Sequence, residues 1–221
     1  MKDQLNLTIK TFYYLLLTVL HIYMYSYLRA TFPEMTFYGR LLFLTNISFY
    51  LNGFYYMSKF LSYVPILNAV FTNFDEKSRR KIFRFGFSLS FVVSFLYWGM
   101  RLADPKMLLA SGVVIPIDLD LFLHGANFGL NFLEHIVITP EHNYDSSLKD
   151  FIIFSIFYSI LLKVALLGFG ITTYPFVAEN SGFVYLAVVC IGVLLMLSGD
   201  LIFRGISKIN EKRSRIKLST E

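Results

Sequence analysis

Charge is scarce in this chain. Asp, Glu, Lys and Arg make up 16% of its 221 residues, whereas soluble domains carry about a quarter. Hydrophobic residues make up 56%, and they include 24 Phe and 15 Tyr. These proportions indicate a membrane protein. The formal net charge of +5 comes from basic residues that cluster between apolar segments and at the C-terminus. This distribution is typical of membrane topology, so we expect no nucleic acid partner.

Several chemical signatures are also missing. The single cysteine, Cys190, excludes an intramolecular disulfide. The sequence contains no Walker-type glycine-rich loop and no tight His/Glu metal motif. Their absence disfavours a soluble nucleotide-dependent or metal-dependent enzyme. We therefore expect neither a cofactor nor a metal ion.

Apolar segments long enough to cross a bilayer recur along the chain. A spanning helix needs about 20 apolar residues, and the segments that approach this length are 9–28, 41–64, 82–100, 117–138, 151–172 and 183–203. The expected fold is therefore all-α: a polytopic membrane bundle of about six transmembrane helices. It forms a single domain, 1–207, followed by a basic tail, 208–221. An even number of spans places both termini on one side, and that side carries most Lys and Arg residues, so both termini are expected in the cytoplasm.

Polar residues share single helix faces in three of these segments. In the fourth segment they fall within roughly a 100° arc at 3.6 residues per turn: Asp120, His124, Asn127, Asn131, Glu134 and His135. The second segment has a similar face: Thr45, Ser48, Asn52, Tyr55, Tyr56 and Lys59. The first segment adds Tyr14, Thr18, His21 and Tyr25. Ionisable side chains are costly in hydrocarbon, so these faces are expected to point inward and to line a central polar cavity.

Thr45 and His124 are expected at matching depths. Both segments enter from the non-cytoplasmic side, and the two residues fall about four and seven positions into them. At 1.5 Å per residue both lie on the order of 6–11 Å below the outer boundary. A histidine can accept the proton of a hydroxyl that attacks a carbonyl, and it can return that proton to the leaving group. This pair is therefore a candidate catalytic unit.

The residues alone leave other functions open. Polar stripes can simply hold helices together in a non-enzymatic scaffold or regulator. A carrier or channel is a second alternative, with Lys59 and Lys163 as partners for an anion or a proton. A haem site using His21 and His124 is a third. Polar residues inside a membrane serve all of these functions.

Four motifs resemble those of a known family. They are Tyr38-Gly39-Arg40 leading to Phe43-Leu44-Thr45, Tyr97-Trp98 followed by Asp104, Tyr174-Pro175-Phe176, and Gly199-Asp200. Over about 37–206 the chain resembles the androgen-induced membrane proteins, which include the androgen-dependent regulator of tissue factor pathway inhibitor. Arg40 stands where that family has a second glycine. The resemblance implies a multi-pass hydrolase with a catalytic threonine and histidine, acting on fatty acid esters of hydroxy fatty acids.

The family's catalytic histidine can be matched in two registers. Matching its His-Gly-x-His motif to His124-Gly125-Ala126-Asn127 places Asn127 at the catalytic position. Matching instead its Ile-Pro pair and its later Glu to Ile115-Pro116 and Glu134 places His124 there without a gap. We adopt the second register.

The resemblance thus favours a membrane-embedded lipid ester hydrolase whose substrate enters from the bilayer. Thr45 corresponds to the nucleophile and His124 to the general base. An oxyanion needs hydrogen-bond donors, and the candidates are Asn46, Asn127, Asn131 and Tyr174. Three acids are candidates to support the imidazole: Asp104, Asp120 and Glu134.

Overall fold

A computed structural model describes residues 2–64, 76–104, 114–138, 148–174 and 182–220. All regular secondary structure within these ranges is helical. The elements are α1 (Lys2–Thr31), α2 (Phe37–Arg40), α3 (Leu44–Tyr63), α5 (Glu76–Ala103), α6 (Ile117–Leu121), η2 (Phe122–Ala126), α7 (Asn127–Leu133), η3 (Glu134–Ile138), α8 (Leu148–Phe169) and α10 (Gly182–Thr220). The elements η2 and η3 are π-helical turns within the fourth segment, which α6 opens.

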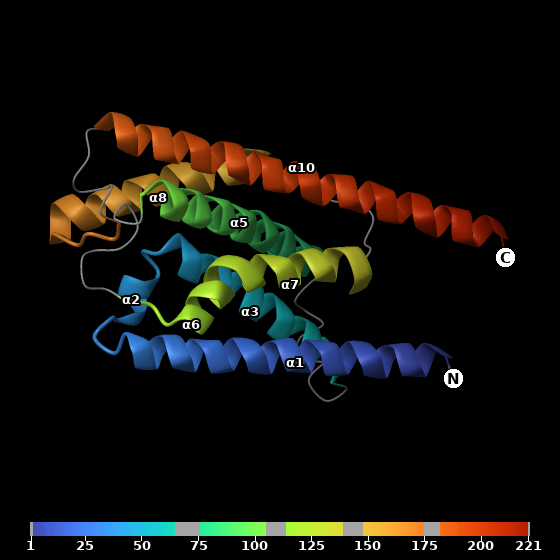
Figure 1. Ribbon diagram of the computed structural model, residues 1–221. Coiled ribbons are helices and arrows are strands. Elements are labelled where there is room, and N and C mark those ends of the chain that lie inside the picture. Colours follow the sequence, from blue (N-terminus) through green and yellow to red (C-terminus); the bar gives the residue numbers. More distant parts are fainter. Residues whose placement is uncertain (1, 65–75, 105–113, 139–147, 175–181, 221) are drawn as a thin grey trace.

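The long helices lie alongside one another in one bundle, and both termini emerge at the same end (Figure 1). α1, α5, α8 and α10 are long and apolar enough to cross a membrane by length and composition. α3 and the segment from α6 to η3 occupy the positions of the second and fourth predicted spans. Both carry one of the polar faces predicted from the sequence, here called polar stripes. The π turns interrupt the segment from α6 to η3. The predicted all-α, multi-pass membrane bundle is confirmed.

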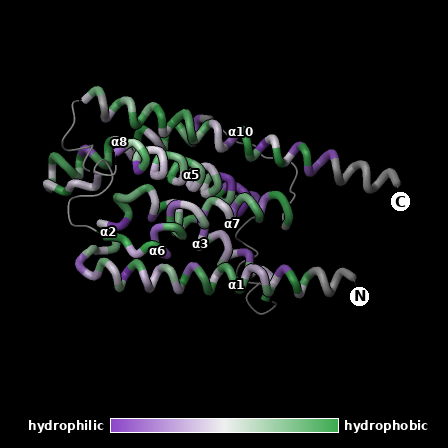
Figure 2. Tube along the Cα trace, in the orientation of Figure 1, coloured by the Kyte–Doolittle hydropathy of each residue, from purple (hydrophilic) through white to green (hydrophobic). Residues whose placement is uncertain are grey.

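Apolar side chains cover the outside of the bundle. Figure 2 shows long hydrophobic stretches along α8 and α10. Large side chains that are exposed there include Phe157, Leu167 and Leu194. On α1, Phe12 and Ile22 are similarly exposed. These apolar surfaces are suited to contact lipid rather than water.

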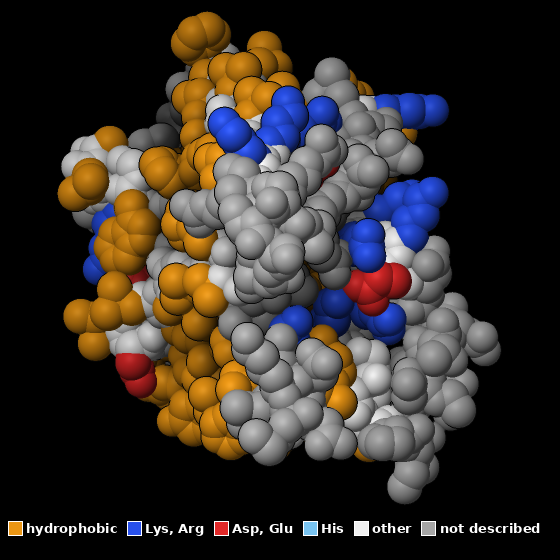
Figure 3. Space-filling model, turned by 90° about the vertical axis from the view of Figure 1, so that its right-hand side faces the viewer, with side chains coloured by type: hydrophobic (Ala, Val, Ile, Leu, Met, Phe, Trp, Pro, Cys, Tyr) orange, Lys and Arg blue, Asp and Glu red, His pale blue; other side chains and the backbone are white. Residues whose placement is uncertain are grey.

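The end that carries both termini is basic. Viewed from that end, Lys and Arg side chains gather around an acidic group (Figure 3). Glu76 there accepts hydrogen bonds from Lys59 at 2.7 Å and from Nε of Arg79 at 2.9 Å. This is the end that the distribution of Lys and Arg along the sequence predicts to face the cytoplasm. α10 continues through the basic region to Thr220, so the expected tail prolongs the last helix.

The polar stripes meet inside the bundle. All six polar residues of the fourth segment are buried, which confirms that this face points inward. Asn127 accepts a hydrogen bond from Asn52 of α3 at 3.1 Å and donates one to Ser48 at 3.3 Å. Asn131 accepts from Tyr56 at 2.7 Å and donates to Ser90 of α5 at 3.1 Å. These contacts join three helices through side-chain amides.

The same pattern continues toward the end that carries both termini. Oε1 of Glu134 accepts hydrogen bonds from the hydroxyls of Tyr14 at 2.5 Å and Tyr55 at 3.1 Å. The prediction of a polar-lined central cavity is therefore wrong. Polar groups in a low-dielectric interior gain most by bonding directly to one another, and here the stripes fill the space between helices themselves. The cavity lies beside most of these residues and is mostly apolar, although Thr45 and His124 of the stripes reach its wall.

Candidate active site

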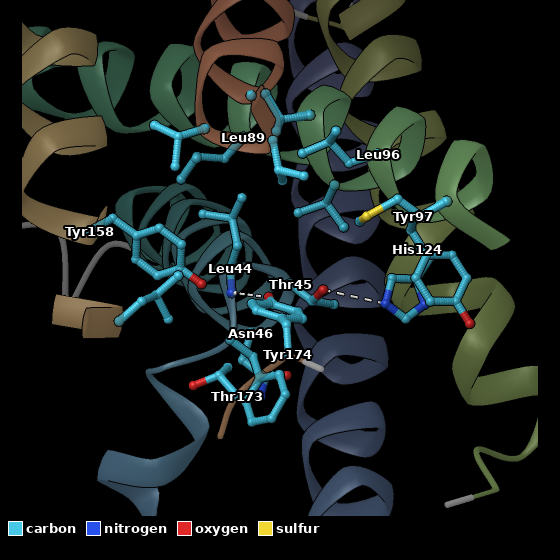
Figure 4. Close-up of a pocket in the computed structure, with 18 of the residues that line it drawn as sticks. Leu44, Thr45, Asn46, Leu89, Leu96, Tyr97, His124, Tyr158, Thr173 and Tyr174 are labelled. Carbon is cyan, nitrogen blue, oxygen red and sulfur yellow. Dashed lines mark hydrogen bonds between the residues drawn. The ribbon is translucent and has the colours of Figure 1, made fainter. Parts of the chain in front are cut away.

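A cavity of about 350 Å³ opens between α1, α3, α5, α8 and α10. Leucine, valine, phenylalanine and methionine side chains form most of its wall. Thr45 and His124 lie on the wall, facing each other from α3 and η2 (Figure 4). A mostly apolar cavity with a few convergent polar groups is the usual form of a site for a small amphiphilic ligand.

Thr45 is placed by the start of α3. Phe43 is extended, with φ −95° and ψ 122°, and it begins the helix without a side-chain cap. The N–H of Leu44 instead donates to the hydroxyl of Tyr174 at 3.1 Å. A residue far along the chain thus accepts the hydrogen bond of the first N–H of the helix. Thr45 follows as the second helical residue. Within the described ranges its own N–H has no hydrogen-bond partner.

His124 lies opposite Thr45 in the π turn η2. Its Nε2 is 3.3 Å from Oγ1 of Thr45. On the other side of the ring, Nδ1 lies 2.8 Å from Oδ1 of Asp120 and 3.1 Å from the Asp120 carbonyl. Both of these oxygens only accept, so Nδ1 carries the hydrogen. Nε2 is then the acceptor that faces the threonine hydroxyl.

Residues of α5 hold this histidine in place. The ring of Tyr97 stacks on the imidazole with centroids 3.5 Å apart and an interplanar angle of 5°. Nε1 of Trp98 donates to the backbone carbonyl of His124 at 3.0 Å. Arg101 pairs with Oδ2 of Asp120, and its Nη1 also donates to the Tyr97 hydroxyl at 2.8 Å. Asp120 is thus bound on both oxygens.

Comparison with protein families gives one match. The model of the FAR-17a/AIG1-like proteins matches residues 9–208. The chain belongs to the FAR-17a/AIG1-like family. This is the family that the motifs around Thr45 and His124 indicated. No curated protein and no solved structure matches the chain.

The predicted site residues of this FAR-17a/AIG1-like chain fall into two groups. Thr45, Asn46, His124 and Tyr174 all line the cavity, and Asp120 lies directly behind His124. The amide of Asn46 donates to the Arg40 carbonyl at 3.1 Å, so it is already engaged.

The remaining candidates lie elsewhere. Asn127 and Asn131 are absent from the cavity wall, and their amides join α3, α5 and α7. Glu134 lies among tyrosines further along the fourth segment. Asp104 is exposed at the outer end of α5. Residues 175 and 176 of the Tyr174 motif lie outside the described residues.

The geometry also bears on the alternative sites. His21 does not line the cavity; its ring packs against Phe49 and Tyr56, with centroids 5.2 Å away in each case. Among the described residues, His21 therefore does not share the cavity that His124 lines, so the two rings do not face a common space for a haem. Lys59 pairs with Glu76, and the ammonium of Lys163 lies 4.3 Å from the Tyr185 ring, so neither lysine reaches the cavity wall.

Sequence reasoning missed Arg101 as part of the site. The four-residue spacing of Tyr97 and Arg101 is the available signal, because residues i and i+4 of a helix are neighbours. That spacing places the arginine beside an aromatic residue. The spacing does not predict that Arg101 also pairs with Asp120 of the fourth segment.

Proposed function

We propose that this protein is a membrane-embedded ester hydrolase with Thr45 as nucleophile and His124 as general base. The observation that carries the proposal is the hydrogen-bonded series Asp120–His124–Thr45, which ends at the wall of an apolar cavity. A nucleophile, a base within reach and a third group that orients the base are the elements of nucleophilic acyl transfer. The 3.3 Å separation is at the long end for such a pair, as is common before substrate binds.

The reaction follows from these positions. The Thr45 hydroxyl attacks the ester carbonyl as its proton passes to Nε2 of His124. The imidazolium that forms is stabilised by the Asp120 carboxylate. The tetrahedral adduct then collapses: the bond to the alcohol oxygen breaks, and His124 returns its proton to that oxygen. Water, deprotonated by His124, attacks the acyl-threonine and releases the carboxylic acid, and the proton goes back to Thr45.

The start of α3 is suited to stabilise the oxyanion. The positive end of a helix dipole favours negative charge, and the Thr45 N–H lies there without a partner among the described residues. The Tyr174 hydroxyl lies next to it, on the Leu44 N–H. Of the predicted donors, Tyr174 therefore fits this role better than Asn127 or Asn131, whose amides bind other helices.

The cavity favours a lipid substrate. Its wall is apolar and it lies between helices, so it suits acyl chains that arrive from the bilayer. Within the family resemblance, the substrate class is fatty acid esters of hydroxy fatty acids. A central ester between two aliphatic chains matches an apolar cavity with one polar wall.

Hydrolysis by the purified protein tests the proposal. Release of hydroxy fatty acid from such an ester in mixed micelles is compared for wild type, Thr45→Ala, Thr45→Ser and His124→Ala. We expect both alanine variants to lose turnover by about 10⁴-fold or more. Thr45→Ser retains the hydroxyl and is expected to keep measurable turnover. Equal rates in wild type and Thr45→Ala would reject the proposal.

A further inference from the structure

The cavity continues from the Thr45–His124 pair toward the end of the bundle that carries both termini. α5, α8 and α10 each contribute residues of one face to this part of the wall. On α5, for example, Leu89, Val92 and Leu96 recur at intervals of three and four positions, which places them on one side of the helix. The three faces therefore enclose a part of the cavity that runs along the helices, here called the inner arm.

The inner arm has a closed floor. Tyr97 stacks on the ring of His124, and Leu89 precedes Tyr97 by eight positions on α5, so it lies about 12 Å further along the helix at 1.5 Å per residue. There Leu89 packs with Met196 and Phe151 in a buried cluster. In the described ranges, no residue of α5 before Leu89 and none of α10 after Met196 lines the cavity. This cluster therefore closes the inner arm.

The hydroxyls on the wall of the inner arm are already engaged. Ser155 and Ser159 of α8 donate to backbone carbonyls one turn earlier at 2.8 and 2.7 Å. The hydroxyls of Tyr158 and Tyr185 donate to backbone carbonyls at 2.8 and 2.7 Å. A polar or charged part of a ligand would lose its hydration here and find no free hydroxyl hydrogen on α8 or α10, which is costly. The inner arm is thus suited to a hydrocarbon chain.

The other end of the cavity offers a polar group. Thr173 follows the end of α8 and lines the cavity. Its Oγ1 is buried and has no hydrogen-bond partner in the described part of the chain. In Figure 4, Thr173 and Leu89 lie on opposite sides of Thr45. A ligand that meets Thr45 therefore gains more by placing its polar half on the Thr173 side than in the inner arm.

Gly192 lies on the wall near the entrance to the inner arm. It belongs to the face of α10 that lines the cavity, on which Val189, Val193 and Met196 all carry large side chains. A Cβ at Gly192 would lie 3.8 Å from Cδ1 of Leu96, at ordinary van der Waals distance. Leu96 precedes Tyr97, the residue that stacks on His124, so this contact lies just past the level of the proposed catalytic pair. The missing side chain at Gly192 thus leaves the way to the floor open.

We propose that the inner arm holds the acyl chain of the ester that Thr45 cleaves, and that Gly192 and the floor limit the length of this chain. This inference rests on the proposed function for the identity of the ligand. With the ester carbonyl at Thr45, an unbranched chain that ends in a methyl group can extend to the floor. The alcohol half of a fatty acid ester of a hydroxy fatty acid carries a carboxylate, which is costly to bury in an apolar arm. That half therefore lies on the Thr173 side.

Photo-crosslinking locates the chain without turnover. Thr45→Ala protein in lipid nanodiscs is irradiated with a palmitic acid analogue that carries a diazirine at the end of its chain, and the modified residues are identified by mass spectrometry. We expect adducts on Leu89 or Met196, and we expect excess palmitate to suppress them. Adducts confined to Phe32, which lines the opposite end of the cavity, or to exposed side chains such as Leu194 would overturn the proposal.

A larger side chain at Gly192 tests the length limit. Esters of one hydroxy fatty acid are compared that differ only in the acyl group, acetyl or palmitoyl. Gly192→Leu should lower the ratio of kcat/KM for the palmitoyl ester to that for the acetyl ester by about tenfold or more, because the added side chain obstructs the long chain alone. An unchanged ratio would overturn the proposal, as would a loss that follows the chain length of the alcohol.

Gly205→Leu is the matched control for this variant. Gly205 lies on the same helix, is exposed and is absent from the cavity wall, and a Cβ there meets nothing within 4 Å. The ratio for Gly205→Leu should stay within about twofold of wild type, since its side chain faces away from the site. If Gly192→Leu fails to fold, crosslinking of the Thr45→Ala protein still decides.

The two proposals fail separately. Adducts at the floor in a protein that hydrolyses no ester would reject the hydrolase and keep the inner arm as a site for an acyl chain. Hydrolysis that is lost in Thr45→Ala, with no adduct at the floor and an unchanged ratio in Gly192→Leu, would keep the hydrolase and reject the inner arm.

Discussion

Asp120 and His124 lie one helical turn apart, and Oδ1 of the aspartate is 2.8 Å from Nδ1 of the histidine. Residues four apart on a helix are neighbours, so the sequence spacing itself produces this contact. The contact fixes the hydrogen on Nδ1 and leaves the lone pair of Nε2 facing Thr45. Arg101 holds the other oxygen of the same carboxylate. The orientation of the proposed base thus depends on one aspartate.

Replacing that carboxylate should impair catalysis more than binding. Asp120→Asn can donate to Nδ1 and so favours the other tautomer, in which Nε2 carries the hydrogen and cannot accept from Thr45. We expect kcat for ester hydrolysis to fall by about 10²- to 10⁴-fold, with KM changed by less than about threefold. Steady-state kinetics in mixed micelles measure both constants.

Asp118→Asn is the matched control for this variant. Asp118 lies on the same short helix, is exposed and accepts a hydrogen bond from Tyr27 at 3.2 Å. Its replacement should leave kcat within about twofold. A similar loss in both variants, or an Asp120→Asn protein with normal kcat, would remove Asp120 from the mechanism.

Asn127 should matter for stability and not for catalysis. Its amide joins Asn52 and Ser48 of α3, so Asn127→Ala leaves buried polar groups without partners. We expect a loss of about 1–2 kcal/mol in stability, seen as a lower unfolding temperature in detergent. Turnover per folded molecule should stay within about threefold. Normal stability with abolished turnover would instead favour the register that places Asn127 at the catalytic position.

Close approach of α3 and α5 at Gly86 gives a prediction about packing. A Cβ at this buried position would lie 2.2 Å from Oδ1 of Asn52, and Asn52 is held by its bond to Asn127. Gly86→Ala should therefore destabilise the bundle by about 1–3 kcal/mol. Gly99→Ala on the same helix meets nothing within 4 Å, so it should be neutral or slightly stabilising. Equal unfolding temperatures for the two variants would contradict this account of the helix contact.

Much of the fold was predictable because burial follows periodicity. The polar face that contains Asp120, His124 and Asn131 is inward as predicted, because charge and amide groups are excluded from lipid. Thr45 and His124 lie within hydrogen-bond range, as their matched depths predicted. The helical period defines which face is polar, and the rise per residue defines how deep each residue lies.

Other features depend on how helices rotate against one another, which no single helix specifies. Asn127 and Asn131 share the face of His124, yet they bind α3 and α5 further along the bundle and line no cavity. The π turn at His124 and the stacking of Tyr97 on its ring likewise arise from the contact between α5 and the fourth segment.

Covalent labelling tests the central claim most directly. The purified protein is treated with an alkyl fluorophosphonate, and the modified residue is located by mass spectrometry in wild type, Thr45→Ala, His124→Ala and Thr173→Ala. Thr173 is the matched control, since it also lines the cavity and is buried. We predict an adduct on Thr45 that is lost in Thr45→Ala, strongly reduced in His124→Ala and unchanged in Thr173→Ala. Equal labelling of wild type and Thr45→Ala, or an adduct on another residue, would contradict the proposed mechanism.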